Sequence, residues 1–410
     1  MITVIGGGAA GLMAAISAAE RGASVTLIEK NNDLGKKIRI TGKGRCNVTN
    51  ACPTEDIFTN IPTNHNFLYS AIYSFTNYDT MDFFENCGVP LKVERGERVF
   101  PVSDKAQDIV SALRKKASEL GVRITCDKAV EILTENGEVK GVKCEKTTFF
   151  CDSVILATGG KSYPLTGSNG EGYIMAEKLG HTISPIKPAL VPIETVEDTA
   201  PLMGLSLKNI SVTVFDQKGK KKFSDFGEML FTHFGMTGPV ILSSSSHMGE
   251  NPEGMRVEID LKPALDEASL DKRILRDFEK YQNKNFENSL SDLLPNKMID
   301  YIVARSGIDR YKKVNSITKE ERRNLLLALK NLSFTVKKYR PVEEAIVTSG
   351  GVNVKEINAS TMESRKIKGL FLAGEVIDVD AYTGGFNLQI AFSSGHLAGE
   401  KAAERENQND

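Results

Sequence analysis

The sequence predicts an α/β fold in which a parallel sheet is assembled from both ends of the chain. A β-barrel-like domain with a helical insertion is expected between those ends. Three observations predict this fold: residues 2–29 read as strand, glycine turn, helix and strand, and two further apolar strands, at 153–157 and 369–375, also end in glycines. Apolar runs without alternation are typical of parallel strands that are buried on both faces.

The opening strand, turn and helix have the glycine spacing of a dinucleotide-binding site. Gly6 permits the tight turn after strand 2–5, Gly8 lets a pyrophosphate approach the backbone, and Gly11 lets helix and strand pack closely. A helix is expected over 9–21. The free N–H groups and the dipole at its start favour a bound pyrophosphate.

The second strand of this unit, 25–29, ends in an acid, Glu29. A carboxylate at this point accepts hydrogen bonds from the hydroxyl groups of the adenosine ribose. The same negative charge would repel a phosphate on that ribose. The ligand predicted from this unit alone is therefore FAD or NAD rather than NADP.

A basic loop that contains glycines, 41–50, follows the βαβ unit. Two glycines flank Lys43, and Lys36, Lys37 and Arg39 precede the loop. Backbone N–H groups and cations in such a loop can contact a pyrophosphate or the pyrimidine edge of a flavin. A solvated basic loop is the alternative, but the interleaved glycines and an asparagine favour cofactor contact.

Periodicity and capping signals place individual helices and strands. One helix is expected over 72–86 and another over 104–120, followed by short strands of an antiparallel meander over 122–150. Pro295 is expected in the first turn of a later helix, and Thr318 is expected to open the next helix with a capping box.

Changes of pattern along the chain predict three parts. An FAD-binding domain is expected over 1–190 and 340–410, and a β-barrel-like substrate domain over 191–262 and 333–339. Helical periodicity predicts an insertion over 263–332.

The strand at 153–157 and the segment at 369–389 narrow the cofactor to FAD. The strand ends in Thr-Gly-Gly, where glycines let the backbone approach a large ligand. The later segment ends its strand in Gly-Glu and starts a helix of small residues at Phe386. The acid of this segment, Glu375, can hold the ribityl or pyrophosphate part of FAD, and the N-terminus of the helix can stabilise negative charge on the reduced flavin ring. NAD-only dehydrogenases do not need this returning segment.

Composition limits the classes of partner. The chain has 410 residues, with 52 Lys and Arg against 53 Asp and Glu and a formal net charge of −1, so it has no general attraction to nucleic acid or anionic lipid. Its start reads as a buried strand and not a signal peptide, and no apolar run approaches the ~18 residues of a membrane span. We therefore expect a cytoplasmic protein with a small-molecule substrate, no nucleic-acid partner and no membrane association. The oligomeric state is left open.

The cysteines and histidines indicate no metal site. The six cysteines form no CxxC pair and no ligand cluster with the five histidines. Free thiols in a reducing compartment are expected.

Four segments of the chain, 6–11, 41–50, 231–235 and 374–389, carry a resemblance to a known family. With them the chain resembles the BaiN-like and aminoacetone oxidase family of bacterial FAD-dependent oxidoreductases. The resemblance implies an FAD domain built from both chain ends, a β-barrel-like domain and a helical insertion. It leaves the reaction open, because members act on substrates as unlike aminoacetone and unsaturated 3-oxo bile acids.

The motifs and the resemblance together give the residues expected to contact FAD, bound without a covalent link. They are Gly6, Gly8, Ala9, Ala10, Gly11, Glu29, Lys30, Lys36, Thr41, Gly42, Gly44, Arg45, Cys46, Asn47, Val130, Thr158, Gly159, Gly160, Gly374, Glu375, Asp378, Gly385, Phe386, Asn387, Leu388 and Gln389.

Two residues are candidates for acid–base chemistry, since the flavin supplies the redox chemistry and the protein orients the substrate. His233 lies next to Gly235 and Gly238. The alternative for it is a hydrogen-bonded structural histidine. Tyr382 precedes the glycine pair before the last helix, where it could donate a hydrogen bond to a substrate carbonyl. Aromatic packing is the alternative there.

The expected activity is hydride transfer between flavin N5 and a small or mid-sized organic substrate, as reduction of an activated C=C bond. For that bond the resemblance suggests a bile-acid-like 3-oxo-enone. Oxidation of an amine with O2 is one alternative, and a flavin-containing RNA-modifying or RNA-binding protein is another. A flavin-bound sensor without turnover is a third. The chain has no second glycine fingerprint, so electrons would come from transiently docked NAD(P)H, from a partner protein or from the substrate itself.

Overall fold

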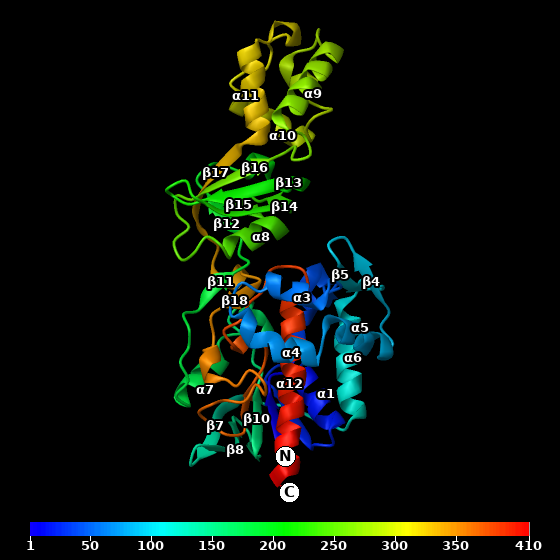
Figure 1. Cartoon of the computed structure of the whole chain (residues 1–410), viewed down its shortest axis with the longest axis vertical. Coiled ribbons are helices and arrows are strands. Elements are labelled where there is room, and N and C mark those ends of the chain that lie inside the picture. The colour runs from blue at the N-terminus through cyan, green and yellow to red at the C-terminus, as the bar shows by residue number, and fades with distance from the viewer. Residues whose placement is uncertain (410) are drawn as a thin grey trace. The chain divides into compact units, whose positions relative to one another are not determined.

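Two compact units make up the protein, as seen in a computed structural model that describes residues 1–409. The first unit joins Met1–Ala189 to the C-terminal part of the chain that begins at Val342. The second unit is the continuous stretch Leu190–Pro341. In Figure 1 the first unit contains both the blue N-terminal elements and the red C-terminal helix.

The first unit is organised around a five-stranded parallel sheet of order β19-β10-β1-β2-β6. Its strands are β1 (Ile2–Ile5), β2 (Val25–Glu29), β6 (Arg123–Cys126), β10 (Ser153–Leu156) and β19 (Leu370–Leu372). Ile2 lies opposite both Val25 and Ser153, and Val154 lies opposite Leu370. Every residue of β1, β10 and β19 is buried, which explains why they read as apolar runs. The sheet is therefore assembled from both ends of the chain.

The last helix of the chain runs alongside the first (Figure 1). Helices of this unit are α1 (Ala9–Glu20), α2 (Lys36–Ile40), α3 (Thr54–Ile57), α4 (Tyr69–Ser74), α5 (Asn77–Asn86), α6 (Ala106–Glu119), α7 (Glu171–Lys178) and α12 (Phe386–Asn409). A Cβ on Gly395 would lie 2.4 Å from the carbonyl oxygen of Ala10, and one on Gly399 would lie 2.3 Å from that of Ala14. The small residues of α12 thus allow close contact with α1.

The single helix expected over 72–86 is wrong. Two helices, α4 and α5, occupy this part of the chain, because Phe75 leaves the helical conformation at φ −149° and ψ 91°. Thr76 then caps α5 by a capping box: its Oγ1 accepts from the N–H of Asp79 at 3.1 Å, and the Asp79 carboxylate accepts from the N–H of Thr76 at 2.8 Å. The helix expected over 104–120 is confirmed as α6.

Smaller antiparallel sheets complete the first unit. They contain β3 (Thr49–Asn50), β5 (Arg98–Pro101) and β4 (Leu91–Glu94); β7 (Ala129–Glu135), β8 (Glu138–Cys144) and β9 (Thr148–Phe150); and β11 (Lys187–Ala189) with β18 (Val347–Ser349). The meander predicted over 122–150 is correct for β7, β8 and β9 but wrong for β6. That strand pairs in parallel with β2, because it follows the long α6 and so returns to the sheet by a crossover.

The second unit contains a closed barrel of order β12-β15-β14-β13-β16-β17. Its strands are β12 (Ile193–Thr195), β13 (Ser206–Phe215), β14 (Lys221–Phe231), β15 (Gly235–Thr237), β16 (Arg256–Asp260) and β17 (Leu332–Tyr339). The rings of Phe231 and Phe334, both fully buried, lie 5.6 Å apart in its core. The parallel sheet and this barrel confirm the predicted fold class.

Helices are inserted between two paired strands of the barrel. The second unit holds α8 (Pro239–Ser245), α9 (Glu267–Lys280), α10 (Asn296–Ser306) and α11 (Lys319–Lys330). The last three lie between β16 and β17 in sequence, although Val257 and Phe334 of those strands are direct partners. The predicted capping box at Thr318 is confirmed. Pro295 is the N-cap residue, one position before the first turn, because its ψ of 142° is still extended.

Across residues 1–409, the helices are all too short or too polar to cross a membrane.

Candidate functional site

The turn between β1 and α1 leaves the N-terminus of α1 open. Gly6 has a φ of 108°, and a Cβ on Gly11 would lie 1.8 Å from the Gly6 oxygen, so both positions require glycine. No side chain caps α1 at Gly8, and its first turn contains no acid. A Cβ on Gly8 would meet no atom within 4 Å. The N–H groups that start this helix, including those of Ala9 and Ala10, are therefore placed to bind an anion.

Glu29 fixes this turn from the end of β2. Its Oε2 accepts from the N–H of Gly7 at 2.7 Å, and its Oε1 accepts from the N–H and the Nδ2 of Asn31 at 2.8 and 2.7 Å. Lys36 Nζ donates to the Oδ1 of the same asparagine at 2.8 Å. A carboxylate has about four acceptor positions. Glu29 therefore keeps capacity for a ribose hydroxyl beside the glycine turn.

Lys30 and Val130 lie on neighbouring parts of the first unit. Lys30 Nζ donates to Glu171 Oε2 at 2.6 Å and to Asn169 Oδ1 at 3.1 Å. Val130 lies in β7 and is 42% exposed, so it offers a surface and not a core contact.

The loop that begins at Thr41 has a left-handed backbone at several positions. Gly42 has a φ of 56° and Gly44 a φ of 85°, and the non-glycine Cys46 has a φ of 62°. The N–H of Cys46 donates to the Thr41 oxygen at 3.0 Å. Burial raises the pKa of the Cys46 thiol to about 12, so this cysteine is a neutral packed group and not a nucleophile.

Arg45 is held by acids of its own unit. Its Nε donates to Asp104 Oδ1 at 2.7 Å, its Nη2 pairs with Glu94, and its guanidinium lies 4.1 Å from the centre of the Phe100 ring. These contacts fix the loop against β4 and β5. They also neutralise the positive charge that the sequence suggested for cofactor contact.

Two buried oxygen atoms at predicted contact positions have no hydrogen-bond partner within the described residues. They are Asn47 Oδ1 and Thr158 Oγ1. An unpaired buried polar atom costs about 1–3 kcal/mol, and such atoms are rare in folded proteins. Next to Thr158, Gly159 has a φ of 73°, and a Cβ on Gly160 would lie 2.6 Å from Thr348 Oγ1. The strand end thus combines close backbone packing with an unsatisfied hydroxyl.

A hydrogen-bonded network around Glu375 joins α2, β18 and the loop that follows β10. Its Oε2 pairs with Lys37 Nζ, and its Oε1 accepts from Ser162 Oγ at 3.1 Å and from the N–H of Thr348 at 2.7 Å. Lys37 Nζ also donates to Ser162 Oγ at 2.7 Å.

Glu375 was predicted as a contact residue, whereas Ser162 and Thr348 were not, and Lys37 was named only among the cations near the 41–50 loop. Lys37 directly follows Lys36, which was predicted to contact FAD. Thr348 stands at the end of a short apolar run and two residues before Gly350 and Gly351, which is a strand-end signal of the same kind as the one at Thr158.

The segment before α12 packs against the N-terminal part of the unit. A Cβ on Gly374 would lie 2.7 Å from the Ala10 Cβ, and one on Gly385 would lie 2.3 Å from the Thr49 oxygen. The Gln389 side chain is fully buried and bonds to Thr49 Oγ1 at 2.6 Å. These contacts place Gly374 beside the start of α1 and the first turn of α12 beside β3.

Asn387 holds the chain just upstream of α12. Its Oδ1 accepts from the N–H of Ala381 at 3.0 Å, and its Nδ2 donates to the Ala381 oxygen at 2.7 Å. Phe386 is buried, and Leu388 is half-buried against the core. Asp378 is half-buried as well. Asn387 and Gln389 therefore shape the helix start by contacts within the protein.

The two candidate acid–base residues lie in different units. His233 is exposed in the turn between β14 and β15, and its ring centre is 5.0 Å from that of Phe234. Tyr382 is half-buried, and its N–H donates to the Asn60 oxygen at 2.9 Å. Burial, and then the charge of Asp380, raise the pKa of the Tyr382 phenol.

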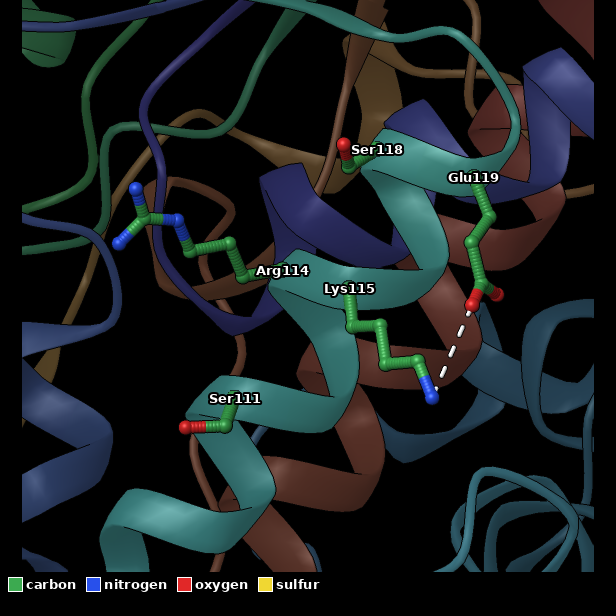
Figure 2. Close-up of a pocket in the computed structure, with 5 residues that line it drawn as sticks. All are labelled: Ser111, Arg114, Lys115, Ser118 and Glu119. Atoms are coloured by element: carbon green, nitrogen blue, oxygen red, sulfur yellow. Dashed lines mark ion pairs between the residues drawn. The ribbon is translucent and has the colours of Figure 1, made fainter.

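A surface hollow on α6 is separate from these residues (Figure 2). It is lined by Ser111, Arg114, Lys115, Ser118 and Glu119, all exposed and all from one helix. Lys115 and Glu119 form an ion pair at 3.8 Å, and Arg114 points away from both. No second element supplies a lining residue, so the hollow is a feature of the helix surface.

All six cysteines are free. Over the residues described, no three His, Cys, Asp or Glu side chains are grouped so that they could hold a metal ion.

The predicted contact residues fit FAD. The open N-terminus of α1 suits its pyrophosphate, and Glu29 suits its adenosine ribose. The unpaired oxygens of Asn47 and Thr158 suit a ligand with many hydrogen-bonding groups.

Comparison with known proteins agrees with this fold. The family model described as "HI0933-like protein Rossmann domain" matches residues 1–401. The chain is 32% identical over 410 residues to the 3-dehydro-bile acid delta(4,6)-reductase of Clostridium scindens, which covers 98% of this chain and 99% of that protein. It is also 32% identical over 397 residues to the ribosomal RNA dihydrouridine synthase of Haemophilus influenzae, which covers 96% of each.

A solved structure shows the same fold. The 3-ketosteroid delta1-dehydrogenase of Sterolibacterium denitrificans, in complex with 1,4-androstadiene-3,17-dione, has a TM-score of 0.53 at 13% identity and covers 98% of this chain and 99% of that chain. Because the family match and the two relatives extend over nearly all of the chain, the protein belongs to the HI0933-like Rossmann family and is an FAD-dependent oxidoreductase.

Proposed function

We propose that this protein reduces a carbon–carbon double bond that is conjugated with a carbonyl group. The observation that carries the proposal is the pair of relatives at 32% identity over nearly the whole chain. One is named for a bile acid delta(4,6)-reductase activity and the other for making dihydrouridine in ribosomal RNA. A 3-oxo steroid with a 4,6-diene and the uracil ring share one reactive unit, a C=C bond next to a carbonyl group.

The residues proposed to hold FAD come from both chain ends. The N–H groups that start α1 would bind the pyrophosphate, and Glu29 would bind the adenosine ribose. Asn47 and Thr158 would satisfy their unpaired oxygens on the cofactor. Glu375, fixed by Lys37, would hold the ribityl or pyrophosphate part. Once reduced, bound FAD supplies the hydride for such a reaction.

The chain's own contribution to catalysis is orientation and a proton. We propose Tyr382 as the group that donates to the substrate, with His233 as the second candidate. We also propose the three-part division of the chain, with the substrate recognised by the barrel strands of residues 191–262 and 333–339. NAD(P)H, docked transiently, is the proposed electron source, and the proposed compartment is the cytoplasm.

A steroid-like 3-oxo-enone is the first candidate substrate, and a uridine of ribosomal RNA is the second. The second candidate is favoured by two relatives named as ribosomal RNA dihydrouridine synthases, from Haemophilus influenzae and Escherichia coli, which cover 96% and 95% of this chain. The net charge of −1 gives no general attraction to RNA. An RNA substrate would therefore depend on local contacts and bind with a modest salt dependence.

The test is flavin reduction and reoxidation followed optically under argon. NADH or NADPH should bleach the flavin of the purified protein, and a 3-oxo-4-ene steroid or ribosomal RNA that lacks dihydrouridine should restore its colour. The acceptor that restores the colour faster identifies the substrate class. Bleaching of oxidised flavin by an amine, with recovery only in air, would instead establish an amine oxidase. A purified protein that neither contains nor binds FAD would contradict the proposal.

A further inference from the structure

A basic hairpin joins β13 and β14, paired strands of the barrel with 10 and 11 residues (Figure 1). Every residue from 218 to 222 except Gly219 is a lysine. Lys218, Lys220 and Lys221 are exposed, and none of the three forms an ion pair with the described residues. Lys222 lies 3.8 Å from the carboxylate of Asp216. Positive charges so close together repel each other, and a bound anion would offset that repulsion.

Hydrogen bonds within the turn fix the backbone that carries these lysines. The N–H of Asp216 donates to the Lys220 oxygen at 2.9 Å, and the N–H of Gly219 donates to the Asp216 oxygen at 2.9 Å. Asp216 Oδ1 accepts from the N–H groups of Lys218 and Lys220 at 3.0 and 2.9 Å. Because the turn is already ordered, a ligand that binds here has less chain entropy to remove.

Below this turn, the outer face of the barrel carries hydroxyl groups and an exposed aromatic ring. Val212 and Val214 of β13 are fully buried, so Thr213 between them faces outward. Its Oγ1 lies 3.0 Å from Ser224 Oγ on β14, which places both hydroxyls on that face. Phe226 follows Ser224 by two positions in the same strand, and 49% of it is exposed. One face therefore combines an exposed ring and two hydroxyls below the lysines.

The acids of the neighbouring strand β16 have partners within the same unit. Glu258 pairs with Arg256 Nε at 3.0 Å, and Asp260 pairs with Lys330 Nζ at 2.6 Å. Asp225 of β14 is exposed but lies opposite the buried Val212, so its position belongs to the other face of the strand. The unpaired charge next to the outer face is therefore positive, although the whole chain has a formal net charge of −1.

We propose that this hairpin surface, defined as the lysines of 218–222 with Thr213, Ser224 and Phe226, binds the RNA strand that carries the target uridine. The inference rests on the ribosomal RNA candidate of the proposed function. The lysines bind phosphates, and the Phe226 ring stacks on an unpaired base. The two hydroxyls bond to the ribose, whose 2′-hydroxyl both donates and accepts.

The combination of groups favours RNA over two other occupants. A steroid substrate has no row of phosphates for the lysines to bind. An anionic lipid surface would use the lysines, but its headgroups offer no flat ring to stack on Phe226. All of the surface lies within the second unit, between Leu190 and Pro341.

The test measures how tightly the FAD-loaded protein binds ribosomal RNA that lacks dihydrouridine, at several salt concentrations. A variant with Lys218→Glu, Lys220→Glu and Lys221→Glu is expected to bind this RNA at least 10-fold more weakly at about 0.1 M salt. The plot of log affinity against log salt should become shallower by about 2, because each phosphate contact on a single strand contributes about 0.7. Phe226→Ala should weaken binding by about 10-fold and leave the slope unchanged, since stacking releases no counterions.

The matched control reverses three exposed bases of the helical insertion, in a variant with Lys272→Glu, Lys319→Glu and Arg323→Glu. The net charge changes by the same amount, and the insertion follows the end of β16 that is opposite to Arg256. This control should bind the RNA as wild type does. Both variants should bind FAD and melt as wild type does, because the altered side chains are exposed. If the glutamates prevent folding, glutamines at the three hairpin lysines provide the test.

No loss of RNA affinity in the hairpin variant, or an equal loss in the control, would overturn the inference. Tighter binding to vesicles of phosphatidylglycerol than to ribosomal RNA would overturn it in favour of a membrane surface. The proposed function fails separately, if the reduced flavin of wild type is reoxidised neither by the bound RNA nor by a 3-oxo-4-ene steroid. That failure is distinct because it is seen in the reaction of wild type and not in the affinities of the variants.

Discussion

At the scale of single residues, Asn47 and Thr158 each have a buried side-chain oxygen without a hydrogen-bond partner among the described residues, and both are predicted to contact FAD. Leaving such an oxygen unpaired costs about 1–3 kcal/mol, a cost that a hydrogen bond to a ligand would offset. Thr158 gives the clearer test, because valine has nearly the same shape as threonine and lacks the hydroxyl.

Thr158→Val is expected to weaken FAD binding by about 5–10-fold, which corresponds to about 1–1.4 kcal/mol for one lost hydrogen bond. The melting temperature of the apoprotein should not fall, because the variant removes an unpaired polar atom. Fluorescence titration of apoprotein with FAD measures the first effect and thermal melting the second. Thr158→Ser keeps the hydroxyl and serves as the control. Equal affinities for valine and threonine would show that this hydroxyl does not contact FAD.

Glu356 gives a pH-dependent prediction away from the site. Although partial burial opposes it, hydrogen bonds from Lys366 and Thr182 lower the pKa of Glu356 to about 2, from an ordinary value of 4.5. A carboxyl whose pKa is lowered by folding stabilises the fold fully above its ordinary pKa. That stabilisation is lost as the pH falls from 4.5 towards 2.

Glu356→Gln should therefore melt at a lower temperature than wild type near neutral pH, and this difference should shrink as the pH drops below about 4.5. Melting temperatures measured between about pH 3 and pH 7 provide the test. A difference that stays constant with pH would mean that the charge of Glu356 does not stabilise the fold.

Prediction of single residues from the sequence succeeded at positions where only one residue type fits the backbone. Gly6 and Gly11 are examples. The positive φ of Gly6 disfavours any side chain, and the Gly6 oxygen lies too close to Gly11 to leave room for one there. Prediction did not extend to the protein partners of long polar side chains. Arg45 and Gln389 are predicted to contact FAD, and in the structure they also bond to Glu94 and Asp104 and to Thr49, partners that the sequence did not indicate. A sequence cannot show which of several donors and acceptors become neighbours.

At the scale of elements, the turn that leads into α1 contains one glycine that folding requires and another that is predicted to leave room for a ligand. Gly11 has no room for a Cβ, because that atom would lie 1.8 Å from the Gly6 oxygen. Gly8 has ample room and a φ of −87°. The two glycines are thus predicted to serve different purposes within one turn.

Gly8→Ala should fold with a melting temperature close to that of wild type but bind FAD at least about 10-fold more weakly, because its methyl group occupies the space proposed for the pyrophosphate. Gly11→Ala should lose several kcal/mol of stability together with FAD binding, since helix and strand must separate. Melting of both apoproteins, followed by FAD titration, distinguishes the two. Normal FAD affinity in Gly8→Ala would contradict the proposed place of the pyrophosphate.

Elements with a strong local signal were predictable. The helix α6 and the capping box of α11 depend on contacts within a few residues and were found where expected. The break at Phe75 between α4 and α5 was missed, because the apolar pattern continues across it while Thr76 starts a new helix. The pairing of β6 was missed because it is set by the crossover through α6 and not by its own sequence.

At the scale of the molecule, the two units have separate hydrophobic cores. The first core draws residues from β1, β2, β10, β19, α1 and α12. The second draws residues from the barrel strands and the helices α9–α11. A domain with its own core can in principle fold alone.

Replacement of residues 190–341 by a short flexible linker should leave a first unit that folds and binds FAD, since its parallel sheet and the helices α1, α6 and α12 remain. Removal of residues from 386 onward should abolish FAD binding, because α12 contributes to that core. Circular dichroism and FAD titration of the two shortened proteins test this. FAD binding by the chain that lacks α12 would show that the returning segment is dispensable.

The central claim is that this protein uses FAD to saturate a C=C bond conjugated with a carbonyl group. The most direct measurement mixes the anaerobically reduced holoprotein with a 3-oxo-4-ene steroid or with ribosomal RNA that lacks dihydrouridine, and records flavin absorbance together with the mass of the product. The account predicts that the flavin regains its oxidised spectrum while one equivalent of one of these substrates gains two hydrogen atoms. Reduced flavin that stays reduced with both substrates, and recovers its colour only in air, would contradict the account.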